Sequence, residues 1–84
     1  MKITFKLFAS LTDYLPVEAR YSNVLELDIA PEASIIQIIE PYGLPPKLVH
    51  LVLINGKYID ADKRLTQTLN EGDVLAIWPP IAGG

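Results

Sequence analysis

The dipeptide Asn55-Gly56 restricts the fold more than any other feature of the sequence. It separates two short runs of mostly apolar residues, 51–54 and 57–59. Asparagine and glycine both tolerate the positive φ angles of a type I′ turn, which is the preferred connection of a two-residue β-hairpin. The sequence therefore predicts two antiparallel strands joined at Asn55-Gly56.

Three further segments have the pattern of β-strands. Residues 2–8 alternate between apolar and polar side chains, which is typical of a half-buried strand, and Phe8 falls on the polar side. Residues 24–29 give a second strand after a long open loop. Residues 74–78 give a last strand after the tight turn Glu71-Gly72-Asp73. We expect the last strand to lie centrally, beside the first strand and parallel to it.

One helix is expected to begin at Ser34. The segment Ser34-Ile35-Ile36-Gln37 matches a capping box, and Ile35, Ile38 and Ile39 then share one helical face. A buried strand is the alternative, because a short run of β-branched isoleucines also suits a sheet. We favour the helix because of its cap, and we expect Pro41 and Gly43 to end it.

The order strand, strand, helix, strand, strand, strand predicts an α+β fold in which one helix crosses one face of a sheet. Short helical turns are expected within residues 10–15 and at Pro46. In the polar segment 60–70, Leu65 and Leu69 are expected to point inward.

Composition excludes several classes of function. The chain has 84 residues and a formal charge of −3, and its seven basic residues are scattered, so a nucleic-acid partner is not expected. It has no cysteine, hence no disulfide, thiolate metal site or cysteine nucleophile. No apolar run is long enough for a membrane span. The first residues alternate between apolar and polar side chains, so a signal peptide is not expected. We expect a soluble, cytoplasmic protein without a membrane partner.

The sequence offers little for catalysis by the chain alone. His50 is the single histidine, and no serine or carboxylate near it in sequence completes a triad. Asp60, Asp62 and Asp73 lack the glycine and bidentate glutamate of a calcium loop and are expected to form turns. No glycine-rich loop follows a strand, so nucleotide binding by this chain is not expected. We predict no metal site and no enzyme activity.

The last residues form a distinctive segment, Trp78-Pro79-Pro80-Ile81-Ala82-Gly83-Gly84. Proline fixes φ and cannot donate a hydrogen bond, so the strand is expected to end at Trp78. Glycine has no Cβ and can therefore enter a narrow channel. The segment predicts a domain of residues 1–78 followed by a flexible carrier tail, residues 79–84. A frayed, inert terminus is the alternative.

If the tail is reactive, its reactive group is the carboxylate of Gly84. A carboxylate is a poor electrophile, because its charge repels nucleophiles and oxide leaves badly. Adenylation would supply a good leaving group, and sulfur or an amine could then attack. This chain has no ATP site of its own, so a partner enzyme must use the ATP.

A set of segments carries a resemblance to a known family: Phe8-Ala9-Ser10-Leu11, Leu53-Ile54-Asn55-Gly56, Leu69-Asn70-Glu71-Gly72-Asp73-Val74 and the tail from Trp78 to Gly84. They are similar to the MoaD/ThiS family of ubiquitin-like sulfur carriers, most closely to the small subunit of molybdopterin synthase. The Pro-Pro-x-Ala-Gly-Gly tail is the specific motif, whereas the Asn-Gly and Gly-Asp-Val turns are individually common.

The resemblance implies a β-grasp, ubiquitin-like fold, with a mixed sheet of four to five strands and one main helix across one face. It implies a carrier that binds no cofactor itself. An E1-like enzyme would adenylate Gly84 with ATP, and the thiocarboxylate formed there would enter the large subunit of molybdopterin synthase and donate sulfur for the molybdenum or tungsten cofactor. A thiazole, a tRNA base, an amino-acid precursor or a protein lysine stay open as acceptors.

The resemblance also implies docking through an apolar sheet face, at positions that correspond here to Phe8, Tyr58 and Trp78. Ile81 and Ala82 would follow the tail into the partner. The alternative places Tyr58 and Trp78 in the core, where aromatic strand residues are common. The chain departs from the family in its short, isoleucine-rich helix, cut by Pro41. Its segment 42–51 resembles less characterised relatives of MoaD and ThiS.

Overall fold

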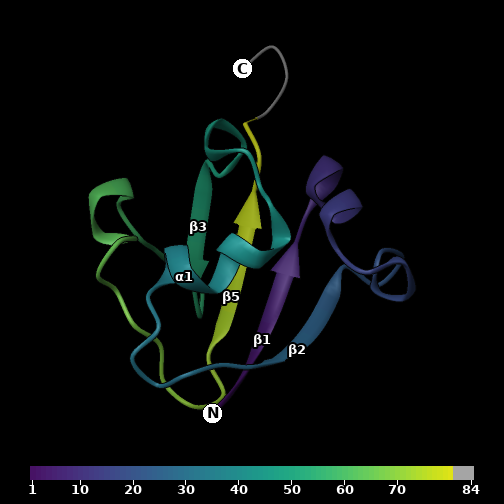
Figure 1. Ribbon diagram of the computed structural model, residues 1–84. Helices are drawn as coiled ribbons and strands as arrows, with labels where there is room; N and C mark the ends of the chain where they lie inside the picture. The colour runs from purple at the N-terminus through teal and green to yellow at the C-terminus, as the bar shows by residue number, and fades with distance from the viewer. Residues whose placement is uncertain (81–84) are drawn as a thin grey trace.

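The computed structural model describes residues 1–80, and Figure 1 shows that they form one sheet with a short helix in front of it. The five strands lie in the order β2-β1-β5-β3-β4. β1 is antiparallel to β2 and parallel to β5, whereas β3 is antiparallel to both β5 and β4. The elements are β1 (Lys2–Leu7), β2 (Val24–Asp28), α1 (Ile35–Ile39), β3 (Leu51–Ile54), β4 (Lys57–Tyr58) and β5 (Val74–Trp78). The predicted α+β class and the central last strand, parallel to the first, are confirmed.

The hydrophobic core lies between α1 and one face of the sheet (Figure 1). Alternate residues of β1, β5 and β3 point into it, because successive side chains of a strand point to opposite faces. Ile35, Ile38 and Ile39 cover this face from the helix. The other residues of this core are Ile3, Phe5, Leu7, Leu11, Leu15, Ala19, Val52, Ile54, Leu69, Leu75 and Ile77. Their removal from water is the main stabilising term of a domain this small.

The capping box at the start of α1 is confirmed. The Gln37 N–H donates to the Ser34 hydroxyl at 3.3 Å, and the Ser34 N–H donates to Gln37 Oε1 at 2.9 Å. The helix continues into a 3-10 turn that ends at Gly43, whose φ is +69°. Proline at position 41 and glycine at position 43 therefore limit the helix as predicted. Short 3-10 turns occur at Ala9–Tyr14, Val17–Ala19, Glu40–Tyr42, Pro46–Leu48 and Ala61–Lys63.

The predicted hairpin is also confirmed. β3 pairs with β4 across Asn55 and Gly56, whose φ angles are +51° and +83°. Both angles are positive, as the type I′ turn requires. The Asn55 side chain also reaches β5, because it donates to Asp73 Oδ1 at 2.8 Å and accepts from the Val74 N–H at 2.9 Å.

The segment between the hairpin and β5 differs from the prediction in one respect. Leu69 is buried as expected, but Leu65 is 68% exposed, so its predicted inward orientation is wrong. Arg64 is the buried residue at this place, with 5% of its surface exposed. Its guanidinium donates to three main-chain carbonyls, those of Val49, His50 and Ile59. Two of these acceptors, Val49 and His50, lie 15 and 14 residues away in the sequence, so no local pattern indicates them.

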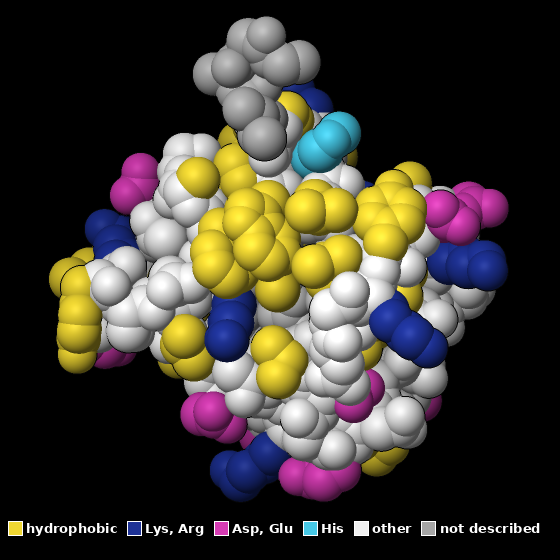
Figure 2. All heavy atoms as spheres, turned by 180° about the vertical axis from the view of Figure 1, so that it is seen from behind, with side chains coloured by type: hydrophobic (Ala, Val, Ile, Leu, Met, Phe, Trp, Pro, Cys, Tyr) yellow, Lys and Arg dark blue, Asp and Glu magenta, His cyan; other side chains and the backbone are white. Residues whose placement is uncertain are grey.

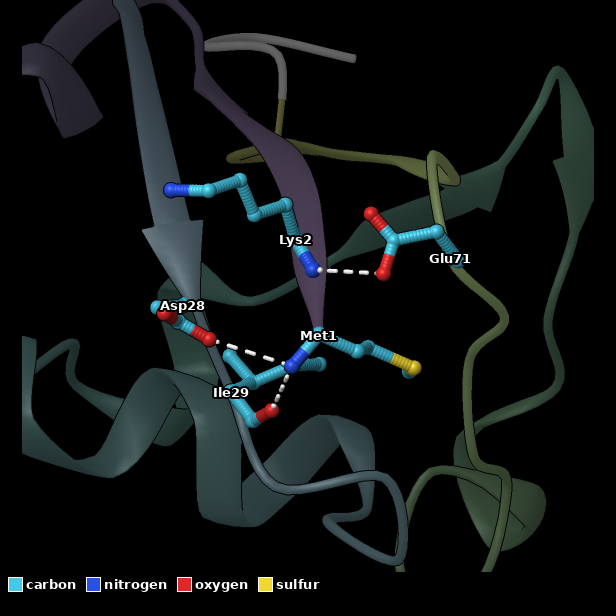
Figure 3. A network of polar contacts seen from close by, with 5 residues as sticks. All are labelled: Met1, Lys2, Asp28, Ile29 and Glu71. Carbon is cyan, nitrogen blue, oxygen red and sulfur yellow. Dashed lines mark hydrogen bonds and ion pairs between the residues drawn. The ribbon is translucent and has the colours of Figure 1, made fainter.

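The N-terminal end of β1 is held on both sides, as Figure 3 shows. The Met1 ammonium donates to Asp28 Oδ1 at 3.0 Å and to the Ile29 carbonyl at 2.9 Å, and the Lys2 N–H donates to Glu71 Oε1 at 3.0 Å. Within residues 1–80, the Met1–Asp28 contact is the one ion pair. The hydrogen bond from Met1, its positive charge and that of Lys2 together lower the pKa of Asp28 below its ordinary value.

Candidate functional site

The face of the sheet opposite α1 is not covered by any described element, and it carries an apolar patch. The strand register aligns Lys6, Ala76, Leu53 and Tyr58 in one row across β1, β5, β3 and β4. Leu51 lies opposite Trp78 in the neighbouring row. We call this surface the open-face patch, formed by Phe8, Leu51, Leu53, Tyr58 and Trp78 around Ala76. Figure 2, which shows the molecule from behind, displays side chains of this type gathered in an apolar area.

Phe8 and Trp78 form the part of the patch closest to the tail. Their rings stack with centroids 3.9 Å apart and planes inclined by only 4°. The Phe8 N–H donates to the Ile77 carbonyl at 3.1 Å, which places Phe8 beside the last residues of β5. Both aromatic side chains are half-buried and neither belongs to the core. The structure thus brings together two predicted site residues, Phe8 and Trp78, that lie far apart in the sequence.

Tyr58 lies on the same face and is 55% exposed. The Arg64 guanidinium carbon lies 6.0 Å from the centre of its ring, within the range of a cation–π contact. This exposure excludes the core interpretation for Tyr58. An aromatic ring with a wet edge is a typical interface anchor, so its assignment to a partner interface stays a prediction that the geometry permits.

The tail begins at the edge of the open-face patch. Pro79 is half-buried and Pro80 is exposed, and neither can donate a main-chain hydrogen bond. The predicted site residues Ile81, Ala82, Gly83 and Gly84 lie outside the described residues. The Trp78 carbonyl accepts from the His50 N–H at 3.2 Å. This bond anchors the main chain immediately before the two prolines.

Residues 1–80 contain no constellation typical of catalysis or metal binding. His50 is exposed, and no group of three or more His, Asp or Glu residues within this range could hold a metal ion. Asp73 acts in a turn, since its Oδ2 accepts from the Asn70 N–H at 2.8 Å. No helix among these residues is long and apolar enough to cross a bilayer.

The sequence interpretation missed Leu51, Leu53 and Ala76 as members of the patch. The run Leu51-Val52-Leu53-Ile54 has no alternation of polar and apolar residues, so it does not show which side chains face the core. The register supplies that information: Val52 lies opposite buried Ile77, which leaves Leu51 and Leu53 on the other face. The faces of Leu51 and Leu53 follow only once the pairing of β3 with β5 is known.

The sheet order, the crossing helix and the open apolar face define a β-grasp protein of the ubiquitin-like class. The chain belongs to the Mut7-C ubiquitin family, which it matches over residues 1–82. No curated protein is similar enough in sequence to count as a match.

Solved structures of similar fold support this class. SAMP1 from Haloferax volcanii matches with a TM-score of 0.68 and 24% identity, covering 100% of both chains. A complex of subunits 1 and 2 of the molybdopterin-converting factor from Helicobacter pylori contains a chain that matches with a TM-score of 0.61 and 21% identity, again over 100% of both chains. Urm1 from Trypanosoma brucei matches with a TM-score of 0.66 and 19% identity, over 99% of this chain and 95% of that one.

These similarities confirm the predicted β-grasp fold and the resemblance to the ubiquitin-like proteins that include MoaD. At these identities the solved structures carry the fold alone. The family match adds that the chain lies among the Mut7-C ubiquitin proteins.

Proposed function

We propose that this protein is a sulfur carrier whose Gly84 carboxylate is activated by a partner enzyme. The single observation that carries the proposal is the position of the open-face patch at the base of the tail. Phe8 and Trp78 stack directly before Pro79, so a partner that binds the patch would hold the start of the tail. From Pro80, four extended residues would reach about 13 Å into that partner.

The proposed chemistry proceeds in two steps. An E1-like adenylating enzyme supplies ATP, and a Gly84 carboxylate oxygen attacks the α-phosphorus, so that pyrophosphate leaves and an acyl-adenylate forms. A sulfur nucleophile, equivalent to hydrosulfide and delivered by the activating system, then attacks the carbonyl carbon. AMP leaves, and the product is a thiocarboxylate. The body of the domain contributes no acid, base or metal to either step, and its role is to be bound and oriented.

For the acceptor we propose the pathway of the molybdenum or tungsten cofactor, with this chain as the small subunit of a molybdopterin synthase. The support is the Helicobacter pylori structure of similar fold, in which subunit 1 forms a complex with subunit 2. A corresponding large subunit would cover the open-face patch and receive the tail. The working compartment of the proposed carrier is the cytoplasm.

The mass of the C-terminal peptide tests the carrier function directly. The purified protein that ends at Gly84 is incubated with ATP, the cognate E1-like enzyme and a sulfur donor, then digested and analysed by mass spectrometry. We expect an increase of about 16 Da on the last peptide, because sulfur replaces oxygen at the activated acyl group. Reactions without ATP are the matched control. An unchanged mass with every E1-like enzyme of the source genome would contradict the proposal.

A second function is favoured by one comparison. The small archaeal modifier protein 1 of Haloferax volcanii, SAMP1, has a similar fold. A modifier would use the same activated Gly84, but a lysine amine would attack the carbonyl and form an isopeptide bond. Conjugates recovered from cells with a Gly-Gly remnant on lysine would favour this function. Their absence, together with a thiocarboxylate on Gly84, would favour the sulfur carrier alone.

A further inference from the structure

Arg64 occupies an unusual environment for a charged residue. Only 5% of its surface is exposed, and no carboxylate in residues 1–80 forms an ion pair with it. Its Nε donates to the Ile59 carbonyl at 3.2 Å, and its two terminal nitrogens donate to the Val49 and His50 carbonyls at 3.0 Å each. A buried cation without a counter-ion is costly, so an aliphatic side chain would be the cheaper choice if only packing mattered.

The three acceptor carbonyls belong to two different ends of the hairpin. Val49 and His50 directly precede β3, whereas Ile59 directly follows β4. The planar guanidinium presents donors in fixed directions, so it holds these two chain segments in one relative position. The main chain of Arg64 is held as well, because its carbonyl accepts from the Ile36 N–H at 3.2 Å in the first turn of α1. Arg64 thus joins the helix to both ends of the hairpin.

This connection leads to the base of the tail. His50, whose carbonyl accepts from Arg64, uses its N–H to bind the Trp78 carbonyl at 3.2 Å. Pro79 and Pro80 follow and have no N–H, so this is the last main-chain hydrogen bond of β5 before the tail within the described residues. The tail base is held on one side by this bond from residue 50 and on the other side by Phe8, whose N–H binds the Ile77 carbonyl and whose ring stacks on Trp78.

We propose that Arg64 is a positioning residue, which fixes the base of the carrier tail through His50 and Trp78; this inference rests on the proposed carrier function. For a partner enzyme docked on the open-face patch, the position of Trp78 sets the point from which the tail enters the partner. Small misplacements of a reacting group reduce the rate of a step strongly while binding continues. Arg64 acts on that placement without touching the reacting atoms.

The test compares Arg64→Met, which keeps the length of the side chain and removes its donors, with Arg64→Lys, which keeps the charge. Arg20→Met is the matched control, because exposed Arg20 donates to a single carbonyl, that of Leu15, outside the open-face patch. The rate of adenylation by the cognate E1-like enzyme is measured per folded molecule. We expect kcat to fall about tenfold or more in both Arg64 variants, with KM changed by less than about threefold.

A role in folding alone would give a different result. If the variants had unchanged kcat per folded molecule, or if only KM changed, the positioning role would be overturned. Arg64→Lys keeps the test decisive should Arg64→Met fail to fold, because one ammonium cannot serve three carbonyls in a fixed plane. Equal losses in Arg20→Met would also overturn it.

Amide hydrogen exchange distinguishes failure of this inference from failure of the carrier function. In Arg64→Met we expect the His50 amide to exchange at least about tenfold faster, while the Ile29 amide, bound to the Met1 carbonyl, is unchanged. Equal acceleration at both amides would contradict the inference whatever the enzyme does. Absence of adenylation in wild-type protein and Arg20→Met would contradict the carrier function, and the exchange result would then stand as the test of Arg64.

Discussion

Phe8 and Trp78 lie at opposite ends of the sequence, yet their rings stack 3.9 Å apart and almost parallel on the open face of the sheet. The parallel pairing of β1 with β5 creates this relationship, since Leu7 lies opposite Ile77 and the next residue of each chain segment then points to the other face. The stack therefore forms where the first strand ends and the tail begins. A partner that covers it would simultaneously contact both segments.

Trp78→Ala and Trp78→Asp are expected to weaken partner binding by at least about 2 kcal/mol, and to lower the free energy of unfolding by less. The reason is that Trp78 is only half-buried in the free domain, whereas a bound partner would bury it fully. Binding to the E1-like enzyme is measured by calorimetry and stability by urea denaturation.

Tyr21→Ala is the control for the Trp78 variants, because Tyr21 is an aromatic side chain with 90% exposure that does not belong to the open-face patch. It should leave both binding and stability nearly unchanged. A loss of stability in Trp78→Ala that exceeds the loss of binding would mean that Trp78 serves mainly to hold the fold.

Removal of Gly83 and Gly84 is expected to abolish transfer of sulfur but to leave the domain folded. The described core extends from Ile3 to Ile77 and is complete without these two glycines, so we expect the urea midpoint to stay unchanged. A version extended by two residues beyond Gly84 should behave in the same way, since its terminal carboxylate is displaced from the activating site. Retained function in the shortened protein, with normal partner binding, would instead indicate an interaction module with an inert tail.

Much of the fold follows from local patterns in the sequence. Asn55-Gly56 fixes the hairpin because few residues accept two consecutive positive φ angles, and Ser34 with Gln37 fixes the start of α1 because both side chains satisfy free main-chain groups. Each of these features involves residues within a few positions of one another. Local hydrogen bonding and sterics are enough to determine them.

The features that could not be predicted depend on distant partners. The sequence gives no reason to bury Arg64 in place of Leu65, because its three acceptors are contributed by Val49, His50 and Ile59. The open-face patch was only partly predicted, since the all-apolar run of β3 hides which of its side chains face outward. The register of the sheet determines which side chains of β3 face the core and which face outward. Register is a property of the paired strands, so one segment alone does not reveal it.

Ser34→Ala is expected to lower the free energy of unfolding by about 1 kcal/mol. The variant removes the hydroxyl that accepts from the Gln37 N–H, and it leaves one main-chain donor of the first turn of α1 without that acceptor. Equilibrium denaturation in urea measures the change. Ser10→Ala is the matched control, because Ser10 is exposed and does not cap α1, and it should have little effect. Equal stability of the two variants would contradict a capping role.

Asn55 is expected to stabilise the domain in two separable ways. Asn55→Gly keeps the positive φ but loses the side-chain bonds to Asp73 and Val74, so we expect a loss of about 1–2 kcal/mol. Asn55→Ala also introduces a residue that disfavours a φ of +51°, which should cost about 1 kcal/mol more. Denaturation of both variants gives the two contributions. Equal losses would show that backbone strain at position 55 is negligible.

The ion pair at the start of β1 makes the free energy of unfolding depend on pH in the acidic range. The pKa of Asp28 is lowered in the folded protein, first by the hydrogen bond from the Met1 ammonium and then by the charges of Met1 and Lys2. A lowered folded pKa means that Asp28 contributes its stabilisation fully above its unfolded pKa of about 3.9 and loses it as pH falls through the folded pKa.

Asp28→Asn should therefore be less stable than wild type at pH 7, and the difference between the two should shrink as the pH falls below about 4. Urea midpoints measured from pH 7 to pH 2.5 check this. A short extension before Met1 should have the same effect as the substitution, because it removes the ammonium that donates to Asp28. Glu32→Gln is the control, since Glu32 is exposed and forms no ion pair within residues 1–80. A constant difference between wild type and Asp28→Asn across this range would show that the Asp28 carboxylate gains nothing from its neighbours.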